Sequence, residues 1–396
     1  MLSKSIITDL SKNLEEPTWL LDRRLQAYEI FKEMDMPSFK YGIGIFVDIS
    51  GLQLEEINPL NNFDKEIIIS EEVEILTFKE AILKHEDLIK EYFMTKCVLP
   101  NENKFTALHA AFFNKGILMI IPENKELTKP IQIKLNINSK SRLDHILIIA
   151  EKNSKAIIIE ASGSQEENGQ LFRSQVVEVI LKENSYLEYI SLQNINKSIY
   201  NFSKRKAHVE TNSFMYWVDC SIGSKFTQSI TSTNLIGLGA IGKSWSVIFG
   251  DQEQCYDINN ETKHIASKTT SEMLTRVVLN DKAKTVYRGL IKISPKAVNC
   301  EGYQKDDTIL LSENAKADVV PNLEIANNEV KCSHGATISQ IDDDKLFYMM
   351  SRGIDDKTAK KAIIEGFFDP IMAKIVNEEM KQEIIDSISK RLGSLN

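Results

Sequence analysis

The sequence predicts a mainly β protein with helical ends, whose core is a stacked β-solenoid. From residue 117 onward, short runs rich in valine and isoleucine follow one another too closely to leave room for intervening helices. Small polar clusters separate the runs, and their starts lie about 28–30 residues apart early in the region and about 13–18 apart later. These spacings resemble a solenoid coil and its half. Helical periodicity is confined to the residues before and after this region.

A large β-sandwich, which also consists of many short strands, is the alternative fold. The solenoid is favoured because no two runs are joined directly by an Asn-Gly or Asp-Gly turn, the strongest hairpin signal. The close spacing also excludes an alternating β–α–β arrangement. The runs that predict strands are 117–121, 130–137, 145–150, 156–162, 176–181, 186–192, FMYWVDCSI, SWSVIF, TVYRGLIKI and DTILL.

The region before the strands, residues 1–116, is predicted to be a mostly helical domain. Residues 16–34 carry leucine, isoleucine and aromatic residues at helical spacing. Pro17 suits the first turn of this helix, and Pro37 stops it. The other elements expected here are a short strand at 42–50 and helices at 76–97 and 105–113.

After the strand region, which is assigned to residues 117–338, helical patterns return at 339–396. A first helix is expected at 343–352, Asp355 caps a second, and Pro370 opens a third. The apolar face of the last two helices is wider than two helices can bury against each other. Part of it must therefore face the solenoid or another protein.

The composition is that of a soluble globular protein, with 42% apolar and 26% charged residues. The net charge of −8 argues against a phosphate-binding surface as the main function. Five scattered cysteines without a CxxC pair exclude a disulfide framework and a zinc ribbon. No apolar run could span a bilayer and the first residues do not read as an export signal, which predicts a cytoplasmic protein. The sequence contains neither a P-loop nor a dinucleotide-binding glycine motif.

The strongest candidate site lies in VKCSHGAT, residues 330–337, which we expect to form a loop between a strand and a helix. Imidazole is the commonest metal ligand and thiolate favours zinc, copper and iron–sulfur centres, so His334 and Cys332 are candidate ligands. Two ligands two residues apart cannot complete a tetrahedral site, so others must come from elsewhere in the chain or from a second chain. The alternative is a loop histidine bonded to a backbone carbonyl beside a buried cysteine.

Other chemistry-bearing residues have simpler interpretations. His264 lies among hydroxyl residues, and a structural histidine is favoured over a serine hydrolase because no GxSxG motif is present. The pairs Asp306–Asp307 and Asp342–Asp344 are expected to be solvated turns and helix caps rather than acid–base pairs.

Three segments resemble one family closely. The segment at 321–368 contains P-x-L-E-I, K-C-S-H-G-A-T, L-F-Y, S-R-G-I and G-F, in the order found in the SufB/SufD family of iron–sulfur cluster assembly proteins. Residues 263–293 are similar to the family's H-x5-T-x-S segment and the D-x-A-x-x-x-(F/Y)-x-G strand that follows it. Residues 17–31 resemble its P-x-W-(L/M)-x-x-R opening. Together these segments span most of the chain, and the C-terminal one is the most specific.

The resemblance implies a right-handed parallel β-helix between helical ends. It implies a non-catalytic scaffold subunit of the SUF (SufBCD) complex, which pairs with SufB through the β-helix. The same resemblance implies that the C-terminal helices, 339–396, bind the ABC-type ATPase SufC. The ATPase activity would then belong to SufC, in agreement with the missing P-loop.

Two positions indicate the branch of the family. SufB-type members carry a cysteine where this chain has Ala315 and a glutamate where it has Gly335, so the resemblance is to the SufD form. It implies that His334 is a metal ligand to a nascent iron–sulfur cluster shared with SufB, whereas Cys332 is a weaker candidate. A cluster with such mixed ligation is more easily transferred than one held by four thiolates. The isolated chain is not expected to hold a cofactor tightly.

Two other functions stay open. A homodimer of this chain would be a self-sufficient scaffold if His334 and Cys332 of both copies bound a cluster. A β-helix enzyme acting on polysaccharides is a more remote alternative, because such enzymes are usually exported and no carboxylate cluster is evident from coil to coil.

Overall fold

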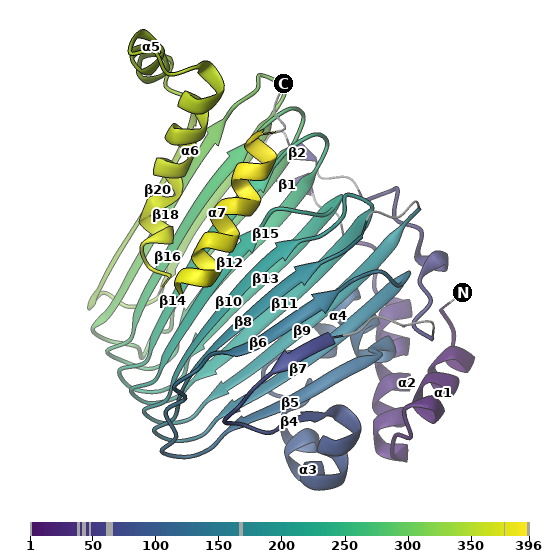
Figure 1. The fold of residues 1–396 in the computed structure, drawn as a ribbon. Helices are drawn as coiled ribbons and strands as arrows, with labels where there is room; N and C mark the ends of the chain where they lie inside the picture. The colour runs from purple at the N-terminus through teal and green to yellow at the C-terminus, as the bar shows by residue number, and fades with distance from the viewer. Residues whose placement is uncertain are drawn as a thin grey trace.

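The computed structural model describes residues 2–37, 40–41, 45–46, 49–60, 66–165, 169–375 and 377–393. Within these residues, two nine-stranded sheets form the two faces of a solenoid (Figure 1). The strands of each sheet pair in parallel, except β3 and β4, which pair antiparallel at the N-terminal end. The predicted mainly β solenoid with helical ends is therefore confirmed, and the β-sandwich is excluded because its strands would pair antiparallel.

Each coil of the solenoid contributes one strand to each sheet. We call the sheet that ends in β20 sheet 1 and the sheet that ends in β19 sheet 2. From its free end, sheet 1 contains β20 (Val330–Gln340), β18 (Cys300–Leu310), β16 (Thr270–Leu279), β14 (Ile241–Gly250), β12 (Phe214–Ser221), β10 (Tyr186–Asn194), β8 (Lys155–Gly163), β6 (Ile131–Asn136) and β3 (Glu66–Ile69). Sheet 2 contains β19 (Lys316–Ile325), β17 (Lys284–Ile293), β15 (Cys255–His264), β13 (Phe226–Leu235), β11 (Ile199–Val209), β9 (Leu171–Leu181), β7 (Ser141–Ala150), β5 (Lys115–Ile121) and β4 (Ile75–Thr77).

The polar clusters of the sequence are the turns between the two strands of a coil. Asn124, Asn153 and Asn184 occupy equivalent turns in successive coils, each with a positive φ. The Asn153 side chain donates to Asn124 Oδ1 at 2.7 Å, and the Asn184 side chain donates to Asn153 Oδ1 at 3.1 Å. Asparagine tolerates the left-handed conformation better than most residues, and the ladder pairs its amide groups from coil to coil.

Several strands were not expected from the sequence, among them β11, β13 and β15. Their inner faces carry Ser, Thr, Asn and Arg rather than valine and isoleucine, so the apolar alternation that marks a strand is missing. The side chains are nevertheless buried, because the solenoid encloses a partly polar interior.

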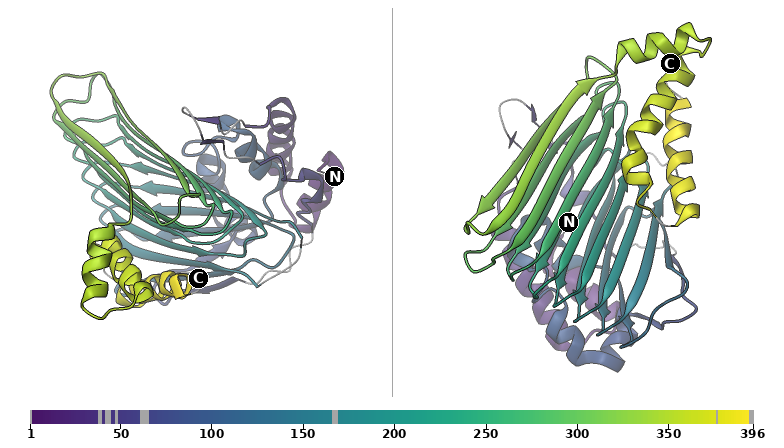
Figure 2. Two further views of the ribbon diagram at one scale, coloured as in Figure 1. Left: turned by 90° about the horizontal axis from the view of Figure 1, so that it is seen from above. Right: turned by 90° about the vertical axis from the view of Figure 1, so that its left-hand side faces the viewer.

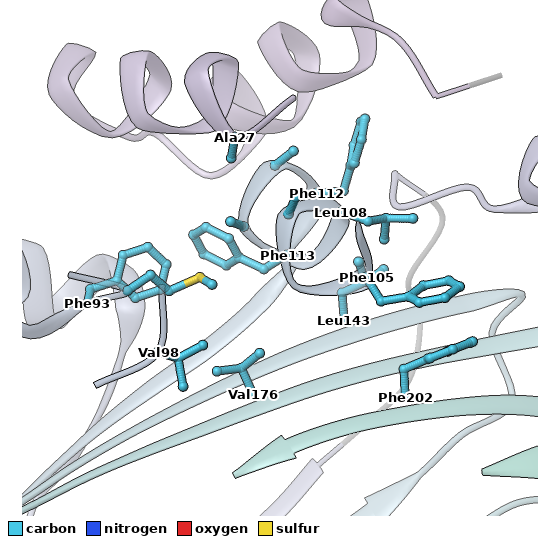
Figure 3. Close-up of a cluster of buried hydrophobic side chains, with 14 of the residues drawn as sticks. Ala27, Phe93, Val98, Phe105, Leu108, Phe112, Phe113, Leu143, Val176 and Phe202 are labelled. Atoms are coloured by element: carbon cyan, nitrogen blue, oxygen red, sulfur yellow. The ribbon is translucent and has the colours of Figure 1, made fainter. Parts of the chain in front are cut away.

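The N-terminal helices cover part of the outer face of sheet 2 at the beginning of the solenoid (Figures 1 and 2). Aromatic side chains of α4 and of the segment around residue 93 pack on Leu143, Val176 and Phe202 of the sheet (Figure 3), and the Phe105 ring stacks on Phe202 at a centroid distance of 3.7 Å. The elements of this region are α1 (Lys4–Asn13), α2 (Thr18–Glu33), β1 (Lys40–Tyr41), β2 (Ile45–Phe46), η1 (Leu54–Glu56), α3 (Phe78–Tyr92), η2 (Pro100–Glu102) and α4 (Lys104–Phe112).

Two boundaries in this region differ from the prediction. The helix expected at 76–97 begins only at Phe78, because residues 75–77 pair with β5 and Thr77 forms a capping box with Glu80. Of the strand expected at 42–50, β2 is described, whereas residues 42–44 and 47–48 lie outside the described residues.

The C-terminal helices are α5 (Asp343–Ser351), α6 (Asp356–Met372) and α7 (Glu378–Gly393). The apolar sides of α6 and α7 lie on the outer face of sheet 1 (Figure 1), where Phe368 and Ile384 join a cluster with Trp245. The expectation that the wide apolar face meets the solenoid is confirmed. None of the described helices has both the length and the apolar character needed to cross a bilayer.

The prediction that Pro370 opens the last helix is wrong. Pro370 lies inside α6, which continues to Met372, and the last helix starts at Glu378. Proline normally breaks a helix because it removes one hydrogen bond and crowds the preceding turn. Here Ile371 and Met372, which follow it directly, are buried in the cluster on sheet 1, and this burial offsets the loss.

Candidate functional site

The VKCSHGAT motif lies in β20, the last strand of sheet 1. The expectation of a loop is therefore wrong, because Cys332 and His334 continue the parallel ladder and pair in register with Gly302 and Gln304 of β18. The motif contains Ser, His and Gly, which do not mark a strand, and the pairing with β18 imposes the extended conformation. Among the described strands, β20 is paired on one side only, at the end of the solenoid opposite the N-terminal helices (Figure 2).

Alternation along β20 places Cys332, His334 and Ala336 on the inner face of the last coil. Cys332 packs against the cluster that contains Cys300, which establishes the inner side. Since no further coil follows in the described residues, His334 is exposed although it faces inward. A side chain at this position is available to a second molecule placed against the open end.

Cys332 is a weaker ligand than His334 in this arrangement. Its side chain is half-buried, and burial raises the pKa of its thiol. A thiol that keeps its proton coordinates metals less readily than a thiolate. Within the described residues, no group of three or more His, Cys, Asp or Glu side chains could hold a metal ion. A cluster bound at His334 would therefore need ligands from another chain.

The two positions that indicated the branch of the family both lie in the last coil, Ala315 just before β19 and Gly335 in β20. Ala315 is buried in the turn just before β19, where it packs in a cluster with Tyr287. Gly335 follows His334 in β20, and a Cβ atom built on it would meet nothing within 4 Å. Because alternation places Gly335 on the face opposite His334, this space lies on the outer side of the last strand.

Polar groups also line the interior of the solenoid behind His334. One row of sheet 1 presents a polar side chain in six successive coils and ends at Ala336 in the last. We call this set of residues the inner polar row. Its members, all buried, are Glu160, Ser191, Asp219, Ser246, Thr275 and Asp306.

The first two carboxylates of the inner polar row have arginine partners from sheet 2. Arg173 lies 2.8 Å from Glu160, and Arg205 lies 2.7 Å from Asp219. Although burial opposes ionisation, the charges of Arg173 and Arg205 hold the pKa of Glu160 at about 2. Coils that hold Ser191, Ser246 or Thr275 separate the carboxylates of this row, and all of its side chains face the interior rather than a surface that could bind a polysaccharide.

The predictions for the other candidate residues agree with the structure in two cases and are wrong in a third. The structural interpretation of His264 agrees with its contacts, because its ring nitrogens bond Thr269 at 2.7 Å and Ser271 at 2.8 Å in a buried position. Asp342 caps α5 as expected. The expectation of a solvated turn at Asp306 and Asp307 is wrong, since both lie in β18 and Asp306 is completely buried.

One buried polar group was missed entirely. Glu178 on the outer face of β9 accepts hydrogen bonds from the backbone N–H groups of Met94 and Val98 and lies 3.2 Å from His145. His145 in turn bonds His109, which bonds the Ser174 hydroxyl. These residues are far apart in the sequence and form no motif, so only the docking of the N-terminal region on sheet 2 brings them together.

The fold and the site define an elongated β-solenoid protein with an accessible histidine on the inner face of its open end. The chain belongs to the SufBD family: the model described as "SUF system FeS cluster assembly, SufBD core domain" matches residues 134–367. The model "SufBD protein N-terminal region" matches residues 55–133. This membership makes the chain an iron–sulfur cluster assembly protein of the SUF system.

Related proteins extend over nearly the whole chain. An "iron-sulfur cluster assembly SufBD family protein" of Staphylococcus epidermidis is 29% identical over 95% of this chain and 90% of its own length. A protein of Staphylococcus haemolyticus with the same description is also 29% identical over the same shares. The "iron-sulfur cluster assembly protein SufB" of Bacillus subtilis is 27% identical, again over 95% and 90%.

Proposed function

We propose that this chain is a SufD-type, non-catalytic scaffold subunit of the SufBCD complex, and that His334 binds the nascent iron–sulfur cluster together with residues of a SufB-type chain. The observation that carries the proposal is the position of His334, inward-facing yet exposed in a strand with one free edge. The SufD assignment is supported by Ala315 and Gly335, which replace the cysteine and glutamate of the SufB form.

The chemistry of a shared site follows from the geometry. A single imidazole from this chain leaves the other coordination positions to the facing chain, so separation of the two chains would remove ligands from the cluster. No strand among the described residues pairs with the outer edges of β19 and β20, although β2 lies close to β19. Strands of the second chain can cover these edges and satisfy their backbone groups. Cluster assembly and cluster release would then be coupled to the contact between the chains.

SufC would bind at the C-terminal helices and supply the ATP-driven change of that contact. The apolar face of α6 and α7 is already covered by sheet 1, so the surface left for SufC includes α5. Phe347, Tyr348 and Met350 of α5 are exposed to 73%, 59% and 46%. Exposed apolar side chains grouped on one short helix are typical of a protein contact.

The proposal is tested by co-expression with SufB and SufC, followed by measurement of iron and acid-labile sulfide on the purified complex. His334→Ala is expected to reduce cluster content at least tenfold while the three subunits still copurify. Ser333→Ala is the matched control, because Ser333 is exposed on the opposite face of the same strand and should leave the content unchanged. Full cluster content with His334→Ala would show that the ligand role is wrong.

If the chain were instead a homodimeric scaffold, the isolated chain would bind a cluster without SufB. Anaerobic reconstitution without SufB would then yield a stable chromophore that is lost with His334→Ala and with Cys332→Ala. The partial burial of Cys332 and its raised thiol pKa argue against this second ligand. Absence of a chromophore on the isolated chain would agree with the heteromeric complex.

A further inference from the structure

One edge of the solenoid changes its chemistry along its length. The turns that join sheet 2 to sheet 1 form a row along this edge (Figure 1). The first residue after each strand of sheet 2 donates a backbone hydrogen bond to the last residue of the strand before it, so its position is equivalent from coil to coil. In three coils this position holds Glu151, Lys182 and Glu210, and in the next two it holds Ile236 and Ile265. The turn itself therefore does not require an apolar residue there.

Leu238 joins the two isoleucines at the tip of its turn. The backbone N–H of Asn212 donates to its carbonyl at 2.9 Å, as that of Asn184 donates to the Thr211 carbonyl, so Leu238 takes the place that threonine has one coil earlier. A Cβ atom built on Gly237 would lie 2.0 Å from the backbone nitrogen of Thr211, so this turn packs directly on the preceding coil. We call the three residues the apolar ridge: Ile236, Leu238 and Ile265, which are 38%, 50% and 44% exposed.

Positive charge lies beside the apolar ridge. Lys268 and Lys296 belong to the same row of turns, are exposed, and make no ion pair within the described residues. The turns at 236–240, 265–269 and 294–299 contain no carboxylate, whereas each of the four turns before them contains at least one glutamate. Exposed apolar side chains beside lysines fit a partner that carries apolar side chains beside carboxylates.

The helix α5 has this complementary chemistry. Asp343, Phe347 and Met350 are spaced by four and three residues, so they share one face of the helix. Phe347 and Met350 are exposed, and Asp343 and its neighbour Asp344 are exposed carboxylates without an ion pair in the part of the chain that the structure describes. Since α5 lies beyond the edge of the solenoid opposite the apolar ridge (Figures 1 and 2), it cannot reach the ridge of its own chain.

We propose that the apolar ridge of one copy of this chain binds α5 of a second copy. The apolar side chains of α5 cover the ridge, and its two carboxylates face Lys268 and Lys296. Because α5 and the ridge lie at opposite edges, a two-fold axis makes the same contact twice and closes the pair. α5 is also the surface proposed for SufC, so the two contacts exclude each other. That exclusion rests on the proposed function; the contact between α5 and the ridge does not.

The contact is tested by photo-crosslinking of the purified full-length chain. The photoreactive residue p-benzoylphenylalanine, which is itself apolar, replaces Leu238. Mass spectrometry of a mixture of isotopically heavy and ordinary chains then identifies products that join two copies. We expect the cross-link to end in α5 of the other copy. The same probe in place of Lys152, the exposed equivalent of Leu238 three coils earlier, is the matched control and should give at least fivefold less of this product.

Charge reversal separates this contact from unspecific apolar association. Lys268→Glu combined with Lys296→Glu should lower the yield of the cross-link at least fivefold, and the addition of Asp343→Lys and Asp344→Lys to the same chain should restore it. All four residues are exposed, so the thermal unfolding midpoint should stay unchanged. A cross-link to another segment such as the open end, no cross-link between copies, or a yield that charge reversal leaves unchanged would overturn the proposal.

Discussion

Glu178 is the buried residue whose ionisation most directly links the N-terminal region to the solenoid. Burial raises the pKa of its carboxyl to about 8, although the hydrogen bonds from Val98 and Met94 oppose the shift. Burial also lowers the pKa of His145 to about 3, so the histidine beside it stays neutral. A protonated Glu178 therefore lies 3.2 Å from a neutral His145, which shares a hydrogen bond with His109.

The stability of the protein should depend on pH through Glu178. Its pKa is higher in the folded than in the unfolded chain, so its contribution is complete below about pH 4.5 and is lost as the pH rises to about 8. The loss should amount to a few kcal/mol, since one pKa unit corresponds to about 1.4 kcal/mol. Glu178→Gln should flatten this decline, measured as the difference between denaturant unfolding midpoints at pH 5 and pH 8.

A matched control for this prediction is Glu188→Gln, a buried carboxyl on the solenoid whose pKa is also raised by burial but which does not contact the N-terminal region. At pH 5, Glu178→Gln should destabilise the fold by about 1–3 kcal/mol. The amide cannot accept hydrogen bonds from the backbone N–H groups of both Val98 and Met94. If the stability of Glu178→Gln declined between pH 5 and pH 8 as steeply as that of the wild-type chain, Glu178 would not be the source of the pH dependence.

At the residue scale, the sequence names candidate ligands but does not show what surrounds them. His334 and Cys332 were identified as candidates from residue type and spacing, because ligand chemistry depends on the side chain itself. Asp306 was mistaken for a solvated residue, since adjacent aspartates usually lie at the surface. Its burial depends on alternation in β18, which assigns Asp306 to the interior and leaves its neighbour Asp307 paired with Arg276.

Among the elements, α5 is a helix on which three large apolar side chains remain exposed in the folded chain. It follows β20 directly and lies away from the sheets, beyond the end of α6 (Figure 1). Asp342 accepts a hydrogen bond from the backbone N–H of Lys345, and this cap fixes the start of the helix. This cap comes from the chain itself, and Phe347 and Tyr348 remain exposed on the helix.

If α5 binds SufC as proposed, Phe347→Ala should weaken that binding without destabilising the chain. Truncation of a central aromatic residue in an interface typically costs about 2–4 kcal/mol of binding free energy, whereas loss of a side chain that is 73% exposed costs the fold little. Isothermal titration with purified SufC measures the first effect, and the thermal unfolding midpoint measures the second.

Ile384→Ala provides the contrasting variant for this experiment. Ile384 is completely buried between α7 and sheet 1, so its truncation should destabilise the C-terminal helices by about 2–5 kcal/mol. Equal SufC affinity for Phe347→Ala and the wild-type chain would exclude α5 from the contact.

At the scale of the elements, the sequence predicts the strands and turns correctly where its pattern of apolar residues is strong. The turn clusters and the isoleucine-rich strands β7 and β8 were recognised because their burial is built from β-branched residues. Strands such as β13, with the sequence FTQSITSTNL, were missed because a polar interior does not produce alternation of apolar and polar residues. The interior is polar because side chains from the two sheets bond each other, as Asn260 bonds Ser246 at 3.2 Å.

The whole molecule has one covered end and one open end. β3 and β4 pair antiparallel with the first coil, and the N-terminal helices adjoin it, whereas β19 and β20 each have one unpaired edge in the described residues. Ile325 and Ile338 at this end are 43% and 45% exposed. An open edge with exposed apolar side chains favours association with another chain.

The isolated chain is therefore expected to self-associate through its open end at high concentration. Ile338→Asp should shift it toward the monomer, because a charge on the last strand would be buried without a partner in the dimer. Sedimentation velocity over a range of concentrations measures the shift. Leu83→Asp is the control, since Leu83 is 78% exposed on α3 in the N-terminal region. If Ile338→Asp left the dimer dissociation constant unchanged, the contact between the two copies would lie elsewhere on the chain.

By itself, the sequence determined the class of the fold, the helical ends and the histidine of the candidate site. These features depend on local patterns: β-branched runs, turn residues such as Asn153 and Asn184, and a motif that is continuous in the chain. The tertiary structure alone decided that His334 lies in the last strand of an open solenoid and that Asp306 lies behind it without a counter-charge. Both facts arise from register between strands about 30 residues apart, which no local pattern of residues encodes.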